Sequence, residues 1–302
     1  MQRKFTDVLL HFRRNPVALM RDIAEIYLRI EVTPKDQRYR RFLWKTLNQE
    51  RAPDEYEFNR VVFGVNSSLF QAQFVAHMYA EKHKDEFRIA TEIVLKATYV
   101  GDSMDSVADE SQGIKLYEEL NQLWSRAGMH THKWLSNSTK VLERIPAESR
   151  ASEVHIASNG LPMVKTLGVT WLPGGDVFTF NANPPEKEFP LTKRNFLKKI
   201  TKLFDPVGFL ALVIIRAKIL LQEMWAAGMD WDDLFLGDLA SKARKWFKEL
   251  EDLPTIKVPR CIRLGQDKKM LSQTLHTFVD ASQDAYGGAV VYSRASIQQQ
   301  YP

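Results

Sequence analysis

A glycine–aspartate pair, Gly101-Asp102, is the first feature of the chain whose residue types could do chemistry. Residues 93–100 before it are mostly apolar, β-branched or aromatic, which favours a strand. Glycine at the first central position of a two-residue loop is the signal of a type II′ hairpin, because only glycine takes the required positive φ without strain. We therefore expect Asp102 at the tip of a β-hairpin. From these residues alone, an ordinary hairpin with a solvated aspartate is the simplest interpretation.

A second carboxylate, Asp22, follows an apolar segment that begins near Val17, and Tyr27 lies five residues further on. Taken alone, Asp22 could be the N-cap of a short helix. From the residues alone, this interpretation outweighs a catalytic role for Asp22.

The box Tyr99-Val100-Gly101-Asp102 resembles the Tyr-x-Asp-Asp box of reverse transcriptases, and in particular the Tyr-Val-Asp-Asp box of Pao/BEL-type long-terminal-repeat retrotransposons. The resemblance extends over residues 5–295 and rests on the order of several boxes. It implies that Asp22 and Asp102 are catalytic ligands of Mg²⁺ or Mn²⁺ in two-metal nucleotidyl transfer. The family supplies three carboxylates, and this chain has Gly101 where the third should be.

Loss of one carboxylate removes a ligand and a unit of counter-charge, so the resemblance implies weak or absent polymerisation. Asp105 lies three residues further on. The returning strand of the hairpin should carry Asp105 away from the site. We therefore do not expect it to replace the missing group.

Three further segments resemble boxes that line the nucleotide pocket of these polymerases. Tyr27 matches the aromatic residue under the incoming sugar, which excludes a 2′-hydroxyl. Phe63 and Gly64 match the Phe-Gly-x-x-x-Ser box, with Arg60 as a further candidate contact. Lys133 matches the lysine that approaches the departing pyrophosphate. Without the resemblance, the second segment is a strand–turn–helix junction and Lys133 is a surface lysine.

The segment from Arg38 to Trp44 interleaves arginines with aromatic and apolar residues. Guanidinium groups that meet phosphates and rings that stack on bases would suit a nucleic-acid groove. An edge strand with a solvated face produces the same pattern. Both interpretations stay open.

The resemblance implies an α+β fold and four regions. Residues 1–150 form partial fingers and a polymerase palm, in which helices at 68–84 and 111–126 pack against an antiparallel sheet. Residues 151–190 form a hairpin that resembles the primer grip, with Leu167 and Gly168 at its centre, and a linker. Residues 191–265 form a helical connection with a basic face. Residues 266–302 resemble the truncated start of a ribonuclease H domain, in which Asp280 matches the first metal-binding carboxylate of an incomplete site, so we expect no nuclease activity.

Composition limits the protein class. A chain of 302 residues with 26% charged residues is typical of a globular protein. Its net charge of +5 is mildly basic, which is compatible with binding to nucleic acid. The single cysteine, Cys261, excludes an intrachain disulfide and cysteine-rich zinc sites. No signal peptide is evident, and the most apolar run, residues 207–215, is too short to span a membrane. We expect an intracellular, cytoplasmic protein, within a virus-like particle in a full element.

Two functions of different class follow. The first is an impaired RNA-directed DNA polymerase that takes an RNA or DNA template-primer and deoxynucleotides, beside the other domains of a polyprotein. The second is a catalytically dead relic with at most nucleic-acid binding. An aspartic peptidase would need an Asp-Thr-Gly or Asp-Ser-Gly loop, and neither occurs.

Overall fold

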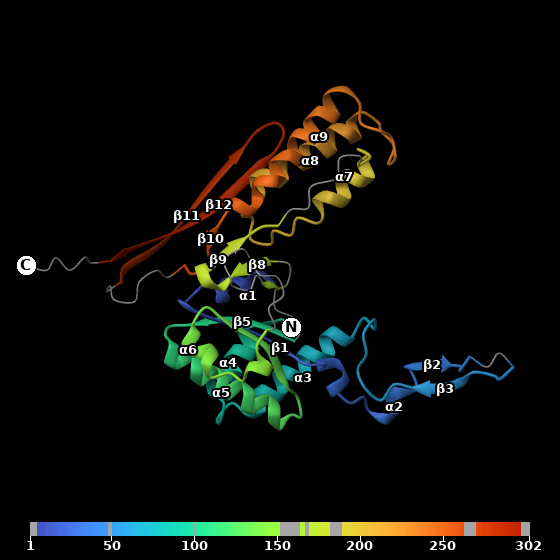
Figure 1. The fold of residues 1–302 in the computed structure, drawn as a ribbon, viewed down its shortest axis with the longest axis vertical. Helices are drawn as coiled ribbons and strands as arrows, with labels where there is room; N and C mark the ends of the chain where they lie inside the picture. Colours follow the sequence, from blue (N-terminus) through green and yellow to red (C-terminus); the bar gives the residue numbers. More distant parts are fainter. Residues whose placement is uncertain are drawn as a thin grey trace, which may run out of the picture. The chain divides into compact units, whose positions relative to one another are not determined.

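The computed structural model describes residues 5–47, 50–99, 101–151, 164–166, 169–181, 189–262 and 270–296 (Figure 1). The chain divides into two compact units. Unit 1 holds residues 1–154 and 261–263, and unit 2 holds residues 155–260 and 264–302. The mixture of helices and strands confirms the expected α+β class.

The centre of unit 1 is an antiparallel sheet with the strand order β4-β5-β1-β6. The sheet consists of β1 (Val17–Ile23), β4 (Thr98–Tyr99), β5 (Asp102–Val107) and β6 (Thr131–Ser136). Strand β1 lies between two partners and is almost entirely buried, which is why its sequence, VALMRDI, is largely apolar. Its side chains alternate between the two faces of the sheet, and Val17, Leu19 and Ile23 belong to the hydrophobic core of the unit.

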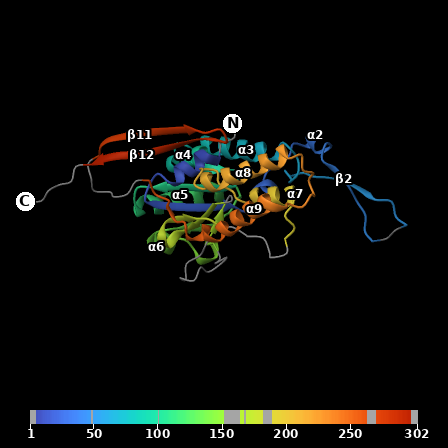
Figure 2. The same ribbon diagram turned by 90° about the horizontal axis from the view of Figure 1, so that it is seen from above.

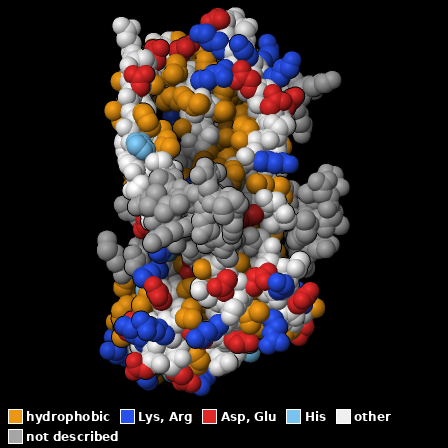
Figure 3. All heavy atoms as spheres, turned by 90° about the vertical axis from the view of Figure 1, so that its left-hand side faces the viewer, with side chains coloured by type: hydrophobic (Ala, Val, Ile, Leu, Met, Phe, Trp, Pro, Cys, Tyr) orange, Lys and Arg blue, Asp and Glu red, His pale blue; other side chains and the backbone are white. Residues whose placement is uncertain are grey.

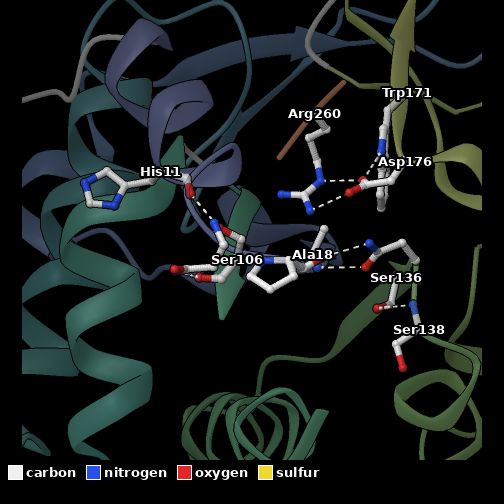
Figure 4. A network of polar contacts seen from close by, with 11 residues as sticks. His11, Ala18, Ser106, Ser136, Ser138, Trp171, Asp176 and Arg260 are labelled. Atoms are coloured by element: carbon white, nitrogen blue, oxygen red, sulfur yellow. Dashed lines mark hydrogen bonds and ion pairs between the residues drawn. The ribbon is translucent and has the colours of Figure 1, made fainter. Parts of the chain in front are cut away.

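Helices supply the rest of that core. They are α1 (Phe5–Phe12), α2 (Pro34–Gln37), α3 (Ser68–Lys82), α4 (Arg88–Ala97), α5 (Glu110–Arg126) and α6 (Thr139–Glu143), with 3-10 turns η1 (Ile26–Arg29) and η2 (Ala147–Ser149). The Asp109 side chain caps α5 by accepting a hydrogen bond from Gln112 N (2.9 Å). Glu119 of α5 accepts from Ile89 N and Ala90 N at the start of α4. Ser106 Oγ of β5 donates to His11 O of α1 (2.7 Å; Figure 4).

The strand expected over residues 93–100 was wrong for most of its length. Residues up to Ala97 belong to helix α4, and only Thr98 and Tyr99 form a strand. Ala90, Ile93, Val94 and Ala97 recur at helical spacing and are all buried. A short apolar run is compatible with either a strand or a buried helix, and here tertiary packing selects the helix.

The expected hairpin is present, but its turn differs from the expectation. Tyr99 pairs with Asp102, so Gly101 lies in the loop and Asp102 is the first residue of β5. The φ of Gly101 lies outside the left-handed region, so this glycine is not required for a positive φ.

A two-stranded ribbon of unit 1 carries the arginine-rich segment. Strands β2 (Arg41–Trp44) and β3 (Asp54–Glu57) are antiparallel and extend away from the rest of the unit (Figure 2). Phe42 stacks on Tyr56 and on Phe58, with ring centroids 5.6 and 4.5 Å apart. Arg41 pairs with glutamates across the ribbon, so its charge is largely balanced.

Unit 2 contains a second antiparallel sheet, in the order β10-β9-β8-β7, and a helical core. Its elements are β7 (Val164–Thr166), β8 (Val169–Leu172), η3 (Pro173–Gly175), β9 (Val177–Thr179), α7 (Lys193–Ile200), α8 (Ala211–Ala226), α9 (Gly237–Glu249), η4 (Leu250–Thr255) and β10 (Val258–Pro259). The buried Arg260 guanidinium pairs with Asp176, which also accepts from Trp171 Nε1 (3.1 Å; Figure 4). Lys193, expected on a basic face, is buried with its ammonium group 3.7 Å from the centre of the Trp225 ring.

A long hairpin ends the described part of unit 2. Strands β11 (Met270–Ala281) and β12 (Tyr286–Ser296) pair only with each other among the described residues. Phe278 and Val290 are among its exposed apolar side chains, as expected for strands without a partner sheet. Figure 3 shows that apolar side chains also gather on one face of unit 2, in the upper half of the view. None of the helices in the described ranges has the length and apolarity needed to cross a membrane.

Gly113 sets how closely α5 approaches the sheet. A Cβ at this position would stand 3.0 Å from Val141 Cγ2 and 3.4 Å from Val17 Cγ1. We expect Gly113→Val to lower the free energy of unfolding by about 2 kcal/mol, because the added methyl groups push α5 off β1 and α6. Urea unfolding measures the change. The matched control is Gln122→Val on the exposed face of α5, where the same branched side chain meets no neighbour. An equal loss in both variants would contradict the packing explanation.

Candidate active site

The pairing register of β1 and β5 brings Asp22 and Asp102 together. Arg21 pairs with Ser103, and Ile23 N donates to Gly101 O (3.2 Å), so the same register places Asp22 directly opposite Asp102. Directly opposed residues of antiparallel strands have Cβ atoms about 5 Å apart on the same face of the sheet. Two carboxylates that are 80 residues apart in the sequence thus share one end of the sheet.

Two basic side chains from β6 also reach Asp22. Lys133 Nζ donates to Asp22 Oδ2 (3.0 Å), and His132 Nε2 lies 3.2 Å from the same oxygen. Consecutive residues of a regular strand face opposite sides. Here the consecutive residues His132 and Lys133 reach the same carboxylate, because β6 contains a bulge. The β1–β6 register shifts between Met20 and Asp22, and Lys133 adopts a left-handed φ of 54°.

A third basic side chain, Arg21, comes from β1 and lies on the core face of the sheet. It is 3% exposed, and its guanidinium carbon is 5.6 Å from the centre of the Trp124 ring. None of its guanidinium nitrogens has a hydrogen-bond partner among the described residues. Burial lowers the pKa of Arg21 to about 9, and the negative charges of Asp22 and Asp102 oppose that shift. The buried cation and the carboxylates therefore stabilise one another.

Asp102 holds its proton more tightly than an ordinary aspartate. Burial, and next the charge of Asp22, raise the pKa of Asp102 to about 6. The positive charges of Lys133, Arg21 and His132 lower it in turn, but not enough to cancel the first two effects. Such a carboxyl is partly desolvated and lies beside a like charge, as in many functional sites.

Gly101 lies directly against Asp22. A Cβ at position 101 would stand 3.0 Å from Asp22 Oδ1, 3.6 Å from Ile26 Cγ2 and 3.7 Å from Ile23 O. The closest of these atoms is the mobile end of a side chain, so a small rotation of the Asp22 carboxylate would make room. A side chain at position 101 would therefore point toward the carboxylate of Asp22.

The predicted nucleotide-pocket residues lie near the same end of the sheet. The rings of Tyr27 and Phe63 meet edge to face with their centroids 5.1 Å apart. Burial, and next the neighbouring Tyr99, raise the pKa of Tyr27. Gly64 has a φ of 83°, which only glycine adopts readily, and Phe63 is largely exposed. The structure thus places Tyr27, Phe63 and Gly64 together, as the resemblance implies for a nucleotide pocket. Their role in binding stays a prediction.

Asp105 lies apart from the two carboxylates. It pairs with Leu19 of the core face, whereas Asp102 lies opposite Asp22 on the other face. Its charged neighbours are Arg14, Glu92 and Lys96, and its carboxylate accepts a hydrogen bond from Ser106 N (2.7 Å). The carboxyl of Asp105 cannot supply the group that Gly101 lacks.

The remaining predicted residues lie elsewhere or outside the described residues. Asp280 lies on β11 opposite Gly287, where its carboxylate accepts from Ala281 N (2.9 Å). Leu167 and Gly168, predicted for the primer grip, lie outside the described residues.

We tested the fit of the site to divalent metal. A pair of Mg²⁺ ions needs several carboxylate oxygens. The described residues contain no group of three or more His, Cys, Asp or Glu side chains placed to hold a metal ion. Two carboxylates face Lys133 and the buried Arg21, so the side chains present do not fit a two-metal centre.

Arg21 and His132 were missed by the sequence analysis. Arg21 occupies an inward position of β1, whose other inward residues are apolar, and that alternation could have marked it as a buried cation. His132 lies next to Lys133, and nothing in a regular strand pattern would place both on one carboxylate. The bulge that does so has no signal in the sequence.

One known family matches the C-terminal part of the chain, a little over a third of its length. Residues 192–302 match the family model described as the Pao retrotransposon-like RNaseH-like domain. The match supports a Pao retrotransposon protein, and at this level it confirms the resemblance. It begins in the helical region around α7 and runs through β11 and β12, and it does not include the residues of the candidate site. No curated protein matches the chain.

The carboxyl of Asp105 predicts a pH-dependent stability. Burial raises its pKa to about 7, well above the value of an unfolded chain. The folded protein therefore binds a proton that the unfolded chain has lost, so the free energy of unfolding falls as pH rises from about 4 to about 7, and the penalty persists above that range. We expect the wild type to lose about 2 kcal/mol more than Asp105→Asn between pH 4.5 and pH 8. Urea unfolding at several pH values measures this difference. The exposed Asp85→Asn should keep the wild-type slope, and an unchanged slope in Asp105→Asn would disprove the explanation.

Proposed function

We propose that unit 1 is the palm of a Pao-type reverse transcriptase in which Gly101 impairs nucleotidyl transfer. One observation carries the proposal: the β1–β5 register sets Asp22 against Asp102 at the end of an antiparallel sheet, and a Cβ at position 101 would stand beside the carboxylate of Asp22. A polymerase site needs carboxylates from two separate strands on one face. An aspartate at position 101 would add the third.

The surrounding residues suit a nucleotide. Tyr27 packs on Phe63 in the position proposed for the sugar, where the phenol ring would exclude a 2′-hydroxyl. The exposed side chain of Lys133 could leave Asp22 and meet a phosphate group. The proposed partners are therefore an RNA or DNA template-primer and deoxynucleotides, with Mg²⁺ or Mn²⁺ as the cofactor of a completed site.

The family match supports the setting of this proposal. A ribonuclease H-like domain in a retrotransposon suggests nucleic-acid binding and a polyprotein context. We place the chain in the cytoplasm, beside the other domains of its element.

A second function is favoured by the charges at the site. Lys133 and Arg21 already balance the two carboxylates, so a chain that binds nucleic acid without polymerising it is the alternative. A measurement of polymerisation by the wild-type chain and its variants distinguishes the two functions.

Primer extension on an RNA template with Mg²⁺ or Mn²⁺ tests the proposal. We expect extension by Gly101→Asp at least 100-fold faster than by the wild type, since a lost ligand in such a site costs several kcal/mol. Gly101→Asn is the matched control, because it adds the same shape without the charge and should stay at the wild-type rate.

The other outcomes are equally informative. Equal, rapid extension by the wild type would show that Gly101 is not disabling. Extension by none of the three proteins, with template-primer still bound in a filter assay, would favour the nucleic-acid-binding alternative.

A further inference from the structure

Helices α8 and α9 of unit 2 pack side by side and enclose a pocket between them (Figure 1). Two ion pairs join the helices, one between Arg216 and Glu249 and the other between Glu223 and Lys242. An early residue of α8 thus meets a late residue of α9, so the helices are antiparallel. The pocket has a volume of about 230 Å³. Pockets for drug-sized ligands measure about 300–1,000 Å³, so this one suits a single ring with a small polar group.

The lining of the pocket comes equally from the two helices. Six residues form it: Arg216, Ile219, Leu220, Lys242, Lys245 and Trp246. On each helix the three residues recur at positions i, i+3 and i+4, which lie on one face. Trp246 is fully buried, its Nε1 donates to Val213 O (2.9 Å), and its ring meets that of Phe196 with the centroids 5.3 Å apart. The apolar wall of the pocket is therefore fixed by the core behind it.

Three cations surround this apolar wall, and they differ in their partners. Arg216 pairs with Glu249, and Lys242 pairs with Glu223 (2.9 Å). Lys245 is exposed and forms no ion pair with a carboxylate of the described residues. Among the groups that lower the pKa of Glu249, the hydrogen bond with Arg216 comes first and the charge of Lys245 comes last, so Lys245 stands off from this carboxylate. One positive charge at the pocket is thus available to a ligand.

An ordinary seam between two helices can also carry lysines, because their stems cover apolar surface while the ammonium groups stay in water. Such a seam is filled by those stems. Here the seam stays hollow between its two ion pairs, and an unpaired ammonium group stands beside a rigid apolar wall. This combination favours a ligand that is apolar on one side and carries one negative charge on the other.

We propose that the pocket between α8 and α9 binds a small aromatic carboxylate. The ring of the ligand lies against Ile219, Leu220 and Trp246, and its carboxylate accepts a hydrogen bond from Lys245. The ion pairs at the two ends of the pocket limit the ligand to about one ring. This inference is independent of the proposed function, because all of its residues belong to unit 2.

Binding of 4-fluorobenzoate, followed as the broadening of its fluorine NMR signal when the full chain is added, tests the proposal. Two other ligands separate its parts. The amide 4-fluorobenzamide has nearly the same shape without the charge, and acetate, measured as a competitor, has the charge without the ring. We expect each of them to bind roughly fivefold more weakly than 4-fluorobenzoate, since each loses one of two modest interactions at a partly exposed site.

Variants locate the binding. Lys245→Gln should lower the affinity for 4-fluorobenzoate roughly fivefold and make it equal to that for 4-fluorobenzamide. Lys248→Gln is the matched control, because it removes the same charge from an exposed position of α9 outside the pocket, and it should leave both affinities unchanged. Ile219→Trp should fill the pocket and weaken the binding of both ligands. Thermal unfolding of each variant confirms that it is folded.

Every other outcome overturns the proposal. No broadening with the wild type would show that the pocket takes no such ligand. Acetate or 4-fluorobenzamide binding as tightly as 4-fluorobenzoate would show that the wall or the charge is not used. Equal losses in Lys245→Gln and Lys248→Gln would show a general charge effect, and unchanged affinity in Lys245→Gln would place the binding elsewhere. If Ile219→Trp does not fold, the comparison of the two lysine variants still decides.

Discussion

The candidate site depends on the register between β1 and β5. A shift of β5 by one residue would turn Asp102 toward the core face and Asp105 toward the opposite face, because the side chains of a strand alternate in direction. Val107 of β5, which is buried in the core and pairs with Val17, opposes that shift, since it would lose its place in the core. The hydrophobic packing of one face thus fixes the pairing of two carboxylates on the other.

The second constraint is the bulge of β6, which changes what those carboxylates face. Regular pairing would direct only one of His132 and Lys133 toward Asp22, and the register shift directs both. Arg21 of β1 adds a positive charge from the core side of the sheet. The carboxylates therefore lie between positive groups from two faces of the sheet, which lowers the cost of burying them.

The sequence predicted the parts of this arrangement that depend on short patterns, and it failed where packing decides. The helices expected at residues 68–84 and 111–126 are present as α3 and α5, because each has an apolar stripe at helical spacing. The segment from Ile93 to Ala97 was assigned to a strand, because a short apolar run has no distinguishing period and only its burial against α5 makes it helical. The aspartates of the site were found through their resemblance to a polymerase box. Arg21 and the Lys133 bulge were not, because a buried cation and a register shift are properties of three paired strands rather than of any one segment.

The residue at position 101 decides whether the charges at this end of the sheet balance. An aspartate there would set three carboxylates against Arg21 and Lys133, and the excess negative charge would need a bound cation. With glycine, the two carboxylates and the two fixed cations balance, so the folded sheet needs no metal ion for neutrality. Removal of the carboxylate would then impair chemistry and relieve repulsion at once, which is the usual opposition between activity and stability at a charged site. A chain with Gly101 can therefore keep the sheet of unit 1 intact without a bound cation.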